Sequence, residues 1–446
     1  MASDVTTVPA SDLLAAPPAP RRTVWTGVLL LALAVLAGAT MRTVFSPLQE
    51  AAKLELGLTD FHISLIQGVA FAVPIALFAI PLGWLADRSN RVRILIALSI
   101  TWTAGTLLTA FAEGFGMLFF ARMLAGVAGN CVVPVAISVA ADYCLPERRG
   151  RTILVLSLGN VVGAAIAFMA GGLLLGAVLE GAAPSLLGLA PWREVSLMVG
   201  VASALLTLPL FLLREPARHE VEKAGASVGD VARALWSRRR FLFPLFVGQV
   251  GVVMADTAAT IWAAPVLIRD FDQTPAEFAG WMGGALIVAG VIGSLIGGFA
   301  ADWGQKLRMK GGLLTGAVAG AVLTVPTALY PIMPNAGLFG VMLTLLLIGG
   351  TVAGLVTATA IAVLIPNEER GLCLGAFMIM GALVGMGAAP IIVTLASQAM
   401  GGEAQLAPAL AITSVIISAL SLLGFWIALR NAPARPADEG LATEGL

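Results

Sequence analysis

The feature that most constrains the fold is a series of long apolar runs that recur along almost the whole chain. A helix of about 20 apolar residues crosses the hydrocarbon core of a bilayer. The chain is 59% hydrophobic and 12% charged and has 50 glycines, which is typical of helical membrane proteins with several spans. We therefore predict twelve spans, at residues 24–50, 60–86, 94–112, 115–143, 151–178, 194–213, 241–267, 275–301, 311–332, 336–364, 371–399 and 406–429.

A short charged stretch occurs twice. GWLADRSNRVR at Gly83–Arg93 is matched by GFAADWGQKLR at Gly298–Arg308, and 298 − 83 gives an offset of 215 residues. The same offset carries Asp87 onto Asp302. Such self-similarity indicates two related six-helix halves. The expected segments are a disordered cytoplasmic tail at 1–22, the halves at 23–213 and 241–430, a cytoplasmic linker at 214–240 and a second tail at 431–446.

The linker carries a pattern of its own. Behind Ser227, apolar residues recur at three- and four-residue spacing from Val228 to Trp236. This spacing predicts a short amphipathic helix that lies on the inner membrane surface. A plain flexible linker is the alternative.

Basic residues set the expected orientation. If the amino terminus is cytoplasmic, the outer loops hold only Lys53, Arg193 and Arg269, while Arg42 and Arg122 lie inside spans. All other lysines and arginines then fall in the tails and inner loops, in agreement with the positive-inside rule. We expect a multi-pass protein of the bacterial inner membrane with both termini in the cytoplasm.

Twelve spans in two halves, with GWLADRSNRVR between spans two and three, resemble the major facilitator superfamily. Two further runs, LGLTDFHISLIQG at Leu56–Gly68 and ADYCLPERRGR at Ala141–Arg151, resemble the bacterial relatives of the spinster transporters. The resemblance implies an all-α fold of two pseudo-symmetric six-helix bundles around a central cavity. It also implies a rocker-switch secondary transporter and lipid-like amphiphiles as cargo.

The repeated motif and two other inner-loop segments are predicted to form a gate. Gly83 would let a neighbouring helix approach, and Asp87 would pair with arginines in contacts that break and re-form as the halves rock. Alternatively, the arginines only fix the topology. The predicted gating residues are Gly83, Asp87, Arg88, Arg91, Arg93, Asp142, Glu147, Arg148, Arg149, Asp302, Arg308, Glu369 and Arg370.

Three ionisable side chains lie at membrane depth, Arg42, Arg122 and Asp256. A charge inside a bilayer costs several kcal/mol unless it faces a partner or water, so each is a candidate for a functional role. At about 1.5 Å per residue, all three reach a similar level in the outer half of the membrane. Spans one, four and seven line the cavity in the superfamily, so we expect one polar cluster. Two guanidinium groups suit a carboxylate or phosphate and favour an anionic cargo.

The acids of the spinster relatives are missing here. In those relatives an aspartate typically precedes the span-one arginine, and a glutamate follows the span-four arginine by seven residues; these places hold Met41 and Gly129. Since 256 − 215 gives 41, Asp256 occupies in the second half the place of Met41 in the first. We expect Asp256 to face Arg42 and Arg122 across the cavity and to couple transport to protons. A permanent structural ion pair is the alternative.

Other polar groups within the spans are candidates to line the transport path. Interhelical hydrogen bonds are the alternative explanation for such residues. These candidates are Asn130, Gln67, Gln249, Thr257, Trp262 and Asn160.

Sequence motifs argue against several classes of protein. The chain has no Walker-type phosphate loop and no HExxH, CxxC or GxSxG motif on a plausible scaffold, which argues against an ATP-driven pump and against an enzyme. We expect a monomer without metal, cofactor or nucleic-acid partner. The predicted function is transport of an amphipathic organic anion. Small carboxylates or sugar acids are the alternative cargo, and an uncoupled facilitator, a lipid scrambler or a non-transporting sensor is the alternative activity.

Overall fold

The computed structural model describes residues 21–433, except 145–147, 184–186, 217–232, 234, 308 and 310. All regular elements in this part of the chain are helical, and twelve segments are long and apolar enough to cross a membrane, as predicted. Nearly all of the two predicted tails, and most of the predicted linker helix, lie outside the described residues.

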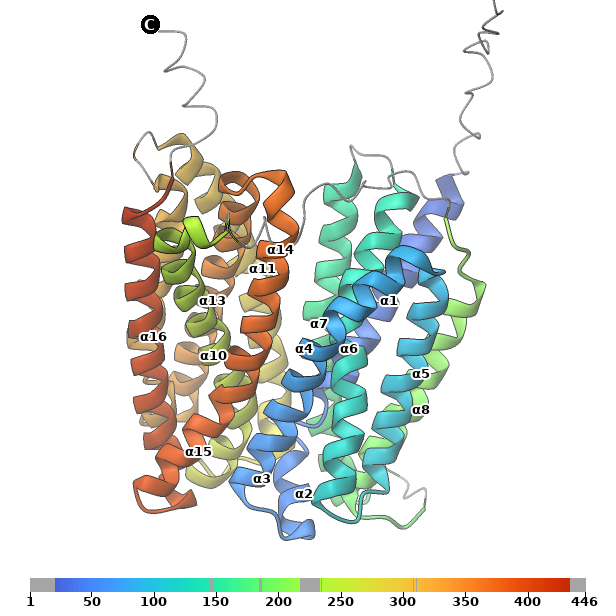
Figure 1. The fold of residues 1–446 in the computed structure, drawn as a ribbon. Coiled ribbons are helices and arrows are strands. Elements are labelled where there is room, and N and C mark those ends of the chain that lie inside the picture. The colour runs from blue at the N-terminus through green and yellow to red at the C-terminus, as the bar shows by residue number, and fades with distance from the viewer. Residues whose placement is uncertain are drawn as a thin grey trace, which may run out of the picture.

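The N-terminal half forms the bundle drawn in blue to green (Figure 1). Its helices are α1 (Arg21–Thr43), α2 (Gln49–Leu56), α3 (Asp60–Ser64), the π-helix η2 (Leu65–Val69), α4 (Ala70–Arg88), α5 (Arg91–Ala110), α6 (Phe115–Tyr143), α7 (Arg149–Leu179), α8 (Pro191–Thr207) and the 3-10 helix η4 (Leu208–Leu212).

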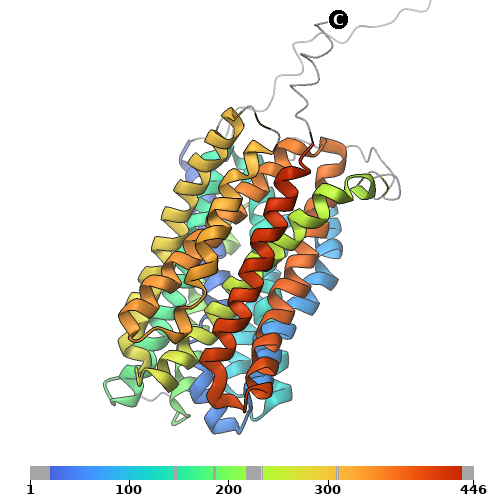
Figure 2. The same cartoon turned by 90° about the vertical axis from the view of Figure 1, so that its left-hand side faces the viewer.

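The C-terminal half forms the second bundle, and Figure 2 shows its long helix α16 in front. Its helices are α10 (Arg239–Asp270), α11 (Pro275–Lys306), η5 (Gly312–Leu314), α12 (Thr315–Thr327), η6 (Tyr330–Ile332), α13 (Ala336–Leu364), α14 (Asn367–Met380), the π-helix η7 (Gly381–Ala388), α15 (Ala389–Ala399), η8 (Glu403–Gln405) and α16 (Leu406–Arg430).

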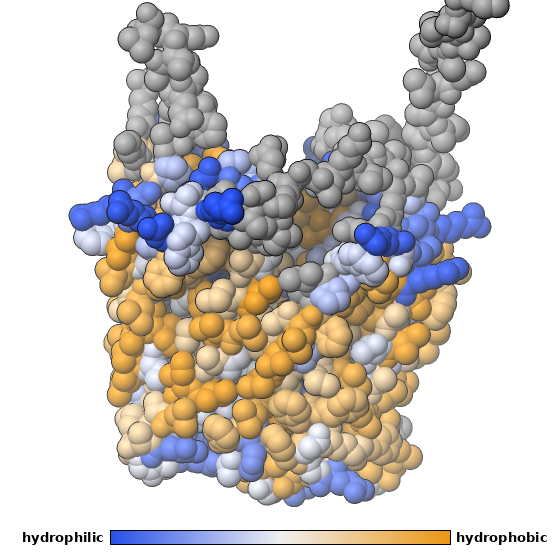
Figure 3. Space-filling model, viewed as in Figure 1, coloured by the Kyte–Doolittle hydropathy of each residue, from blue (hydrophilic) through white to orange (hydrophobic). Residues whose placement is uncertain are grey.

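On the face drawn in Figure 3, a broad apolar belt lies between two hydrophilic ends. Helix α1 begins and α16 ends at one end, which we call the inner end, and α2 and α3 lie at the opposite, outer end (Figure 1). An apolar belt crossed by twelve helices is the surface that a bilayer covers. The chain is therefore an integral membrane protein.

The first span ends earlier than predicted. Helix α1 stops at Thr43 instead of continuing to residue 50, and a turn at residues 44–48 leads into α2. Pro47 lies in this turn, and proline has no amide hydrogen to continue a helix. In the second half, α10 runs unbroken to Asp270, which the repeat places opposite Glu55 because 270 − 215 gives 55. The break is therefore particular to the first half.

The most extensive contacts between the two halves are those of α7 with α11 and of α4 with η7. The first pair packs very closely, since a Cβ atom added at Gly172 would lie 2.6 Å from the carbonyl oxygen of Pro275. The second pair includes π-helical turns on both sides, because η2 also contacts η7. A Cβ atom at Gly68 would lie 2.7 Å from Pro390. Small residues thus allow the backbones of the halves to approach.

Candidate functional site

Arg122 on α6 is fully buried and holds the end of α1. Its guanidinium donates to the carbonyl oxygens of Met41 at 3.2 Å and of Arg42 at 2.5 Å. The last carbonyls of a helix have no partner within the helix, so the side chain acts as a cap. The rings of Phe45 and Phe71 each lie 5.1 Å from the guanidinium carbon. The Arg122 charge is therefore enclosed by the N-terminal half.

Arg42 lies in the last turn of α1 and differs from Arg122 in its surroundings. Its side chain is only partly buried, and Nη1 donates to Oδ1 of Asn130 at 2.9 Å. The Asn130 amide in turn donates to the carbonyl of Gly126 at 2.8 Å, which orients the asparagine. Arg42 and Arg122, two of the three members of the predicted cluster, thus lie close together, and Asn130 contacts Arg42.

Asp256 does not join this grouping. Its carboxylate faces α13, where a Cβ atom added at Gly350 would lie 2.6 Å from Oδ1. In the described part of the chain the carboxylate has no ion pair and no hydrogen bond. The expected contact with Arg42 and Arg122 is therefore absent from this conformation. The offset of 215 residues placed Asp256 opposite Met41, but its side chain points towards Gly350 on α13.

Gln67 takes part in a chain of hydrogen bonds between the halves. Its amide donates to Oε1 of Gln49 at 3.0 Å, and the Gln49 amide donates to the carbonyl of Ile261 on α10 at 2.5 Å. Pro265 stands four residues after Ile261 and has no amide hydrogen, so this carbonyl lacks its helical donor. Gln49 replaces that donor from the opposite half.

The remaining polar candidates are separate from Arg42. Gln249 lies against α13, with its amide nitrogen 3.4 Å from a Cβ atom added at Gly354. Trp262 is fully buried in the core instead of lining an accessible path. Polar atoms of Gln249, Trp262 and Asn160 are buried without a hydrogen-bond partner among the described residues. The Thr257 carbonyl accepts from the hydroxyl of Thr260 at 3.1 Å.

Ion pairs join the two halves at the outer end, and they involve Lys53 and Arg269, which the sequence suggested only as topology markers. Arg269, at the end of α10, donates to both carboxylate oxygens of Glu50 and to both of Asp60, each at 2.8 Å. Glu50 and Asp60 belong to the N-terminal half and Arg269 to the C-terminal half. Burial raises the pKa of Glu50, although the charges of Arg269 and Lys53 act in the opposite direction.

A second contact extends this outer network to the loop before α16. Lys53 lies 2.7 Å from Asp60 and 2.5 Å from Glu403, and the Asp60 amide donates to Glu403 at 2.7 Å. Asp60 is only 2% exposed. Helices α3 and α15 contact one another here (Figure 1). In the sequence, the only indication of this network was the presence of opposite charges at residues 50–60, 269 and 403. Which of these charges pair could not be predicted, because the segments come together only when the two halves pack against each other.

Among the described residues, the ion pairs of Arg91 and Glu369 at the inner end do not join the two halves. Arg91 contacts Asp142 at 2.6 Å and Glu215 at 2.7 Å. Glu369 pairs with Arg238. Three of the predicted gating residues therefore form ion pairs, in positions that tie the ends of helices within each bundle.

Among the described side chains, Gly83, Arg88 and Arg370 do not join the two halves. A Cβ atom at Gly83 would meet nothing within 4 Å, so the expected close approach of a helix is absent in this conformation. Arg88 stacks on Trp84 at 4.6 Å, and Arg370 donates to the Ile365 carbonyl at 3.2 Å. Arg93, Arg148 and Asp302 are exposed, and Arg149 is partly buried. The side chains of Asp87, Glu147 and Arg308 lie outside the described residues.

Comparison with known proteins agrees with the helix arrangement. A family model described as Major Facilitator Superfamily matches residues 30–390. An MFS-type efflux pump of Mycolicibacterium smegmatis is 25% identical over 417 residues, which cover 92% of this chain and 93% of that protein. A probable sulfoacetate transporter of Cupriavidus necator is 26% identical over 61% of this chain and 64% of its own length.

A solved structure shares the whole fold. It is the crystal structure of a bacterial homologue of the human lysosomal transporter spinster in an inward-facing, unoccupied conformation, with a TM-score of 0.78 and 22% sequence identity. The match covers 93% of this chain and 99% of that one. The predicted resemblance to bacterial spinster relatives is confirmed at the level of the fold, and the chain belongs to the major facilitator superfamily.

Proposed function

We propose that this protein is a secondary transporter that carries an amphipathic organic anion across the bacterial inner membrane, with both termini in the cytoplasm. The observation that carries the proposal is Arg42, a partly buried arginine within the first span whose Nη1 donates to Asn130. A cation in this position needs an anionic partner or water. Its planar fork suits a carboxylate, sulfonate or phosphate.

Alternating access is the proposed mechanism. The Arg269 network joins the halves at the outer end, whereas the Arg91 and Glu369 pairs lie within single halves at the inner end. This difference between the two ends supports a conformation in which the halves are joined at the outer end and can separate at the inner end. Rocking of the bundles would break the outer network and bring the inner ends together.

Asp256 is the proposed coupling group. Its carboxylate is partly buried on α10 and has no partner among the described residues, so taking up a proton removes an unpaired charge from the membrane interior. Arg42 is not its partner in this conformation. Coupling therefore acts through the carboxylate of Asp256 in the C-terminal half. A proton neutralises this carboxylate before the two bundles rock.

Replacing Arg42 with alanine is expected to abolish ligand binding with little effect on folding. The test is a thermal-shift measurement on purified protein with sulfoacetate and with lysophosphatidylglycerol, an anionic lysolipid, at two pH values. We expect one of these ligands to raise the Tm of the parent protein but not of the Arg42→Ala variant. Arg93→Ala, which removes an exposed arginine, serves as the control and should retain the shift. A Tm shift that survives Arg42→Ala would remove Arg42 from the binding role.

Replacing Asp256 with asparagine is expected to separate transport from the proton gradient. In proteoliposomes, Asp256→Asn should lose uptake driven by a pH gradient while it retains exchange of labelled for unlabelled cargo. Asp302→Asn, an exposed aspartate near the inner end, is the matched control and should behave like the parent protein. Unchanged gradient-driven uptake in Asp256→Asn would contradict the coupling role.

A small carboxylate or sulfonate is the second candidate cargo. The probable sulfoacetate transporter of Cupriavidus necator, at 26% identity, favours it. One accessible guanidinium is enough to bind a small anion. In the thermal-shift comparison, a response to sulfoacetate without a response to the lysolipid would select this candidate.

A further inference from the structure

A groove of about 510 Å³ lies between α11 and α13, away from Arg42 and Asp256. It begins near the outer end, at Gln273 and Gly337, and extends to Leu345. Eight residues of α13 separate Gly337 from Leu345, which corresponds to about 12 Å along the helix axis. Since the hydrocarbon core is about 30 Å thick, the groove has nearly the depth of one leaflet. Its lining residues are Gln273, Trp281, Ala285, Val288, Ala336, Gly337, Gly340, Val341, Thr344 and Leu345.

Small side chains create this recess. A Cβ atom added at Gly337 would meet only the neighbouring Asn335 side chain, at 3.3 Å. A Cβ atom added at Gly340 would lie 3.1 Å from the ring of Trp281, so glycine at this position leaves room for that ring. The rim is apolar and faces outwards, with Val341 55% exposed and Val288 40% exposed. At this depth of the membrane, outward-facing apolar side chains contact lipid because water is absent there. The shape and lining therefore suit a single acyl chain.

The mouth of the groove carries polar groups that indicate the head group. Oε1 of Gln273 is buried and has no hydrogen-bond partner among the described residues, whereas its backbone amide donates to Leu267. Asp272, next to it in the chain, is exposed, has a positive φ of 52° and adds a negative charge to this turn. An unsatisfied acceptor next to a carboxylate favours a cation that donates hydrogen bonds. A primary ammonium is a cation and donates hydrogen bonds. The quaternary ammonium of choline is a cation but has no hydrogen to donate.

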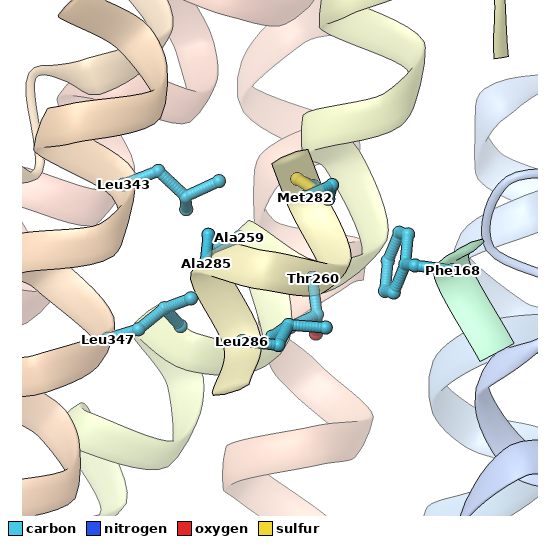
Figure 4. A pocket seen from close by; sticks show the side chains of 8 residues that line it. All are labelled: Phe168, Ala259, Thr260, Met282, Ala285, Leu286, Leu343 and Leu347. Carbon is cyan, nitrogen blue, oxygen red and sulfur yellow. The ribbon is translucent and has the colours of Figure 1, made fainter. Parts of the chain in front are cut away.

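We propose that this groove binds one phosphatidylethanolamine molecule from the outer-end leaflet, with an acyl chain along α13 and the ammonium at Gln273. The site is separate from the proposed cargo site on Arg42. Its wall is thin, because Ala285 lines both the groove and a small internal cavity with Phe168, Thr260 and Leu347 (Figure 4). The Thr260 hydroxyl donates to the Asp256 carbonyl at 2.9 Å. A bound lipid therefore supports the packing next to the proposed coupling group.

The test compares lipids that differ only in the head group. Purified protein is incubated with phosphatidylethanolamine or with phosphatidylcholine of the same acyl chains, and bound lipid is counted by native mass spectrometry. We expect one tightly retained phosphatidylethanolamine and a preference over phosphatidylcholine. Gln273→Leu should reduce that preference about five-fold, the effect of losing one hydrogen bond.

Variants that fill the groove test the acyl-chain site independently of the head group. Gly337→Leu and Gly340→Leu should each lose the retained lipid, and the first has space for the new side chain. Gly284→Leu is the control, since it adds the same bulk to α11 in open space outside the groove. Equal retention of both lipids by the parent protein, or equal lipid loss in Gly284→Leu and Gly337→Leu, would overturn the proposal.

Discussion

Replacing Arg269 with alanine is expected to open the outer end of the protein. The change leaves the carboxylates of Glu50 and Asp60 without their shared guanidinium, while Lys53 remains beside Asp60. Removing one partner of a buried ion pair typically costs about 3–5 kcal/mol because the other charge stays desolvated. That cost falls on the closed conformation, because separation of the halves exposes these carboxylates to water. The equilibrium should shift towards an outward-open state.

Thiol labelling can detect this opening. Ser46 precedes Glu50 by one helical turn's length of chain, accepts a hydrogen bond from Gln67 and is 5% exposed. Ser46→Cys therefore provides a reporter in a background where Cys131, Cys144 and Cys373 are replaced by serine. A membrane-impermeant maleimide should label the reporter from outside when Arg269→Ala is present, and only weakly when it is absent.

The control is an outer-end arginine that pairs within one half. Arg193 on α8 contacts Glu55 on α2 at 2.9 Å, and both belong to the N-terminal bundle. Arg193→Ala should leave labelling of the reporter unchanged. Similar labelling in the two arginine variants would mean that the network does not close the outer end.

Replacing Arg122 with alanine is expected to destabilise the protein, in contrast to the effect on binding predicted for Arg42→Ala. The Arg122 guanidinium donates to the carbonyls of Met41 and Arg42, and each hydrogen bond to a charged group contributes about 1.5–3 kcal/mol. Its loss also leaves space between Phe45 and Phe71, which now flank the guanidinium. We expect a loss of about 3–5 kcal/mol in the free energy of unfolding.

A clear fall in Tm in detergent is the expected readout. Arg122→Lys tests the geometry, since a single ammonium on a flexible stem does not reproduce the planar fork that spans two carbonyls. It should therefore recover only part of the Tm. Arg88→Ala, an exposed arginine on the ring of Trp84, should change stability by less than about 0.5 kcal/mol. An Arg122→Ala variant with parental Tm but no ligand binding would instead place Arg122 in direct contact with cargo.

The fold could be predicted from the sequence because its determinants are local and repeated. Apolar runs locate the spans, and the recurrence of Gly83–Arg93 at Gly298–Arg308 divides them into two halves. The end of α1 was missed because average hydropathy over the run continues past Thr43, although Pro47 marked the break. Hydropathy reflects the free energy of transferring side chains into lipid. It contains no information on missing backbone amide hydrogens, such as that of Pro47, which end a helix.

The candidate site could be predicted only in part. Helix rise gives the depth of Arg42, Arg122 and Asp256, but the direction of a side chain changes by about 100° per residue and depends on how helices are rotated in the bundle. Asp256 therefore has an unexpected neighbour, Gly350. The Arg269 network could not be predicted from the sequence for a related reason. Arg269 and its partners Glu50 and Asp60 come from segments that meet only when the two halves pack against each other.

The hydrogen bond from Gln49 to Ile261 has a consequence for the effect of ionic strength. Dissolved ions screen exposed charges strongly and buried charges much less, and Asp60 is buried. An amide–carbonyl contact carries no net charge and is little affected. Pro265 keeps the Ile261 carbonyl available for this contact in any buffer. Concentrated electrolyte alone should therefore leave the contacts between the bundles at the outer end in place.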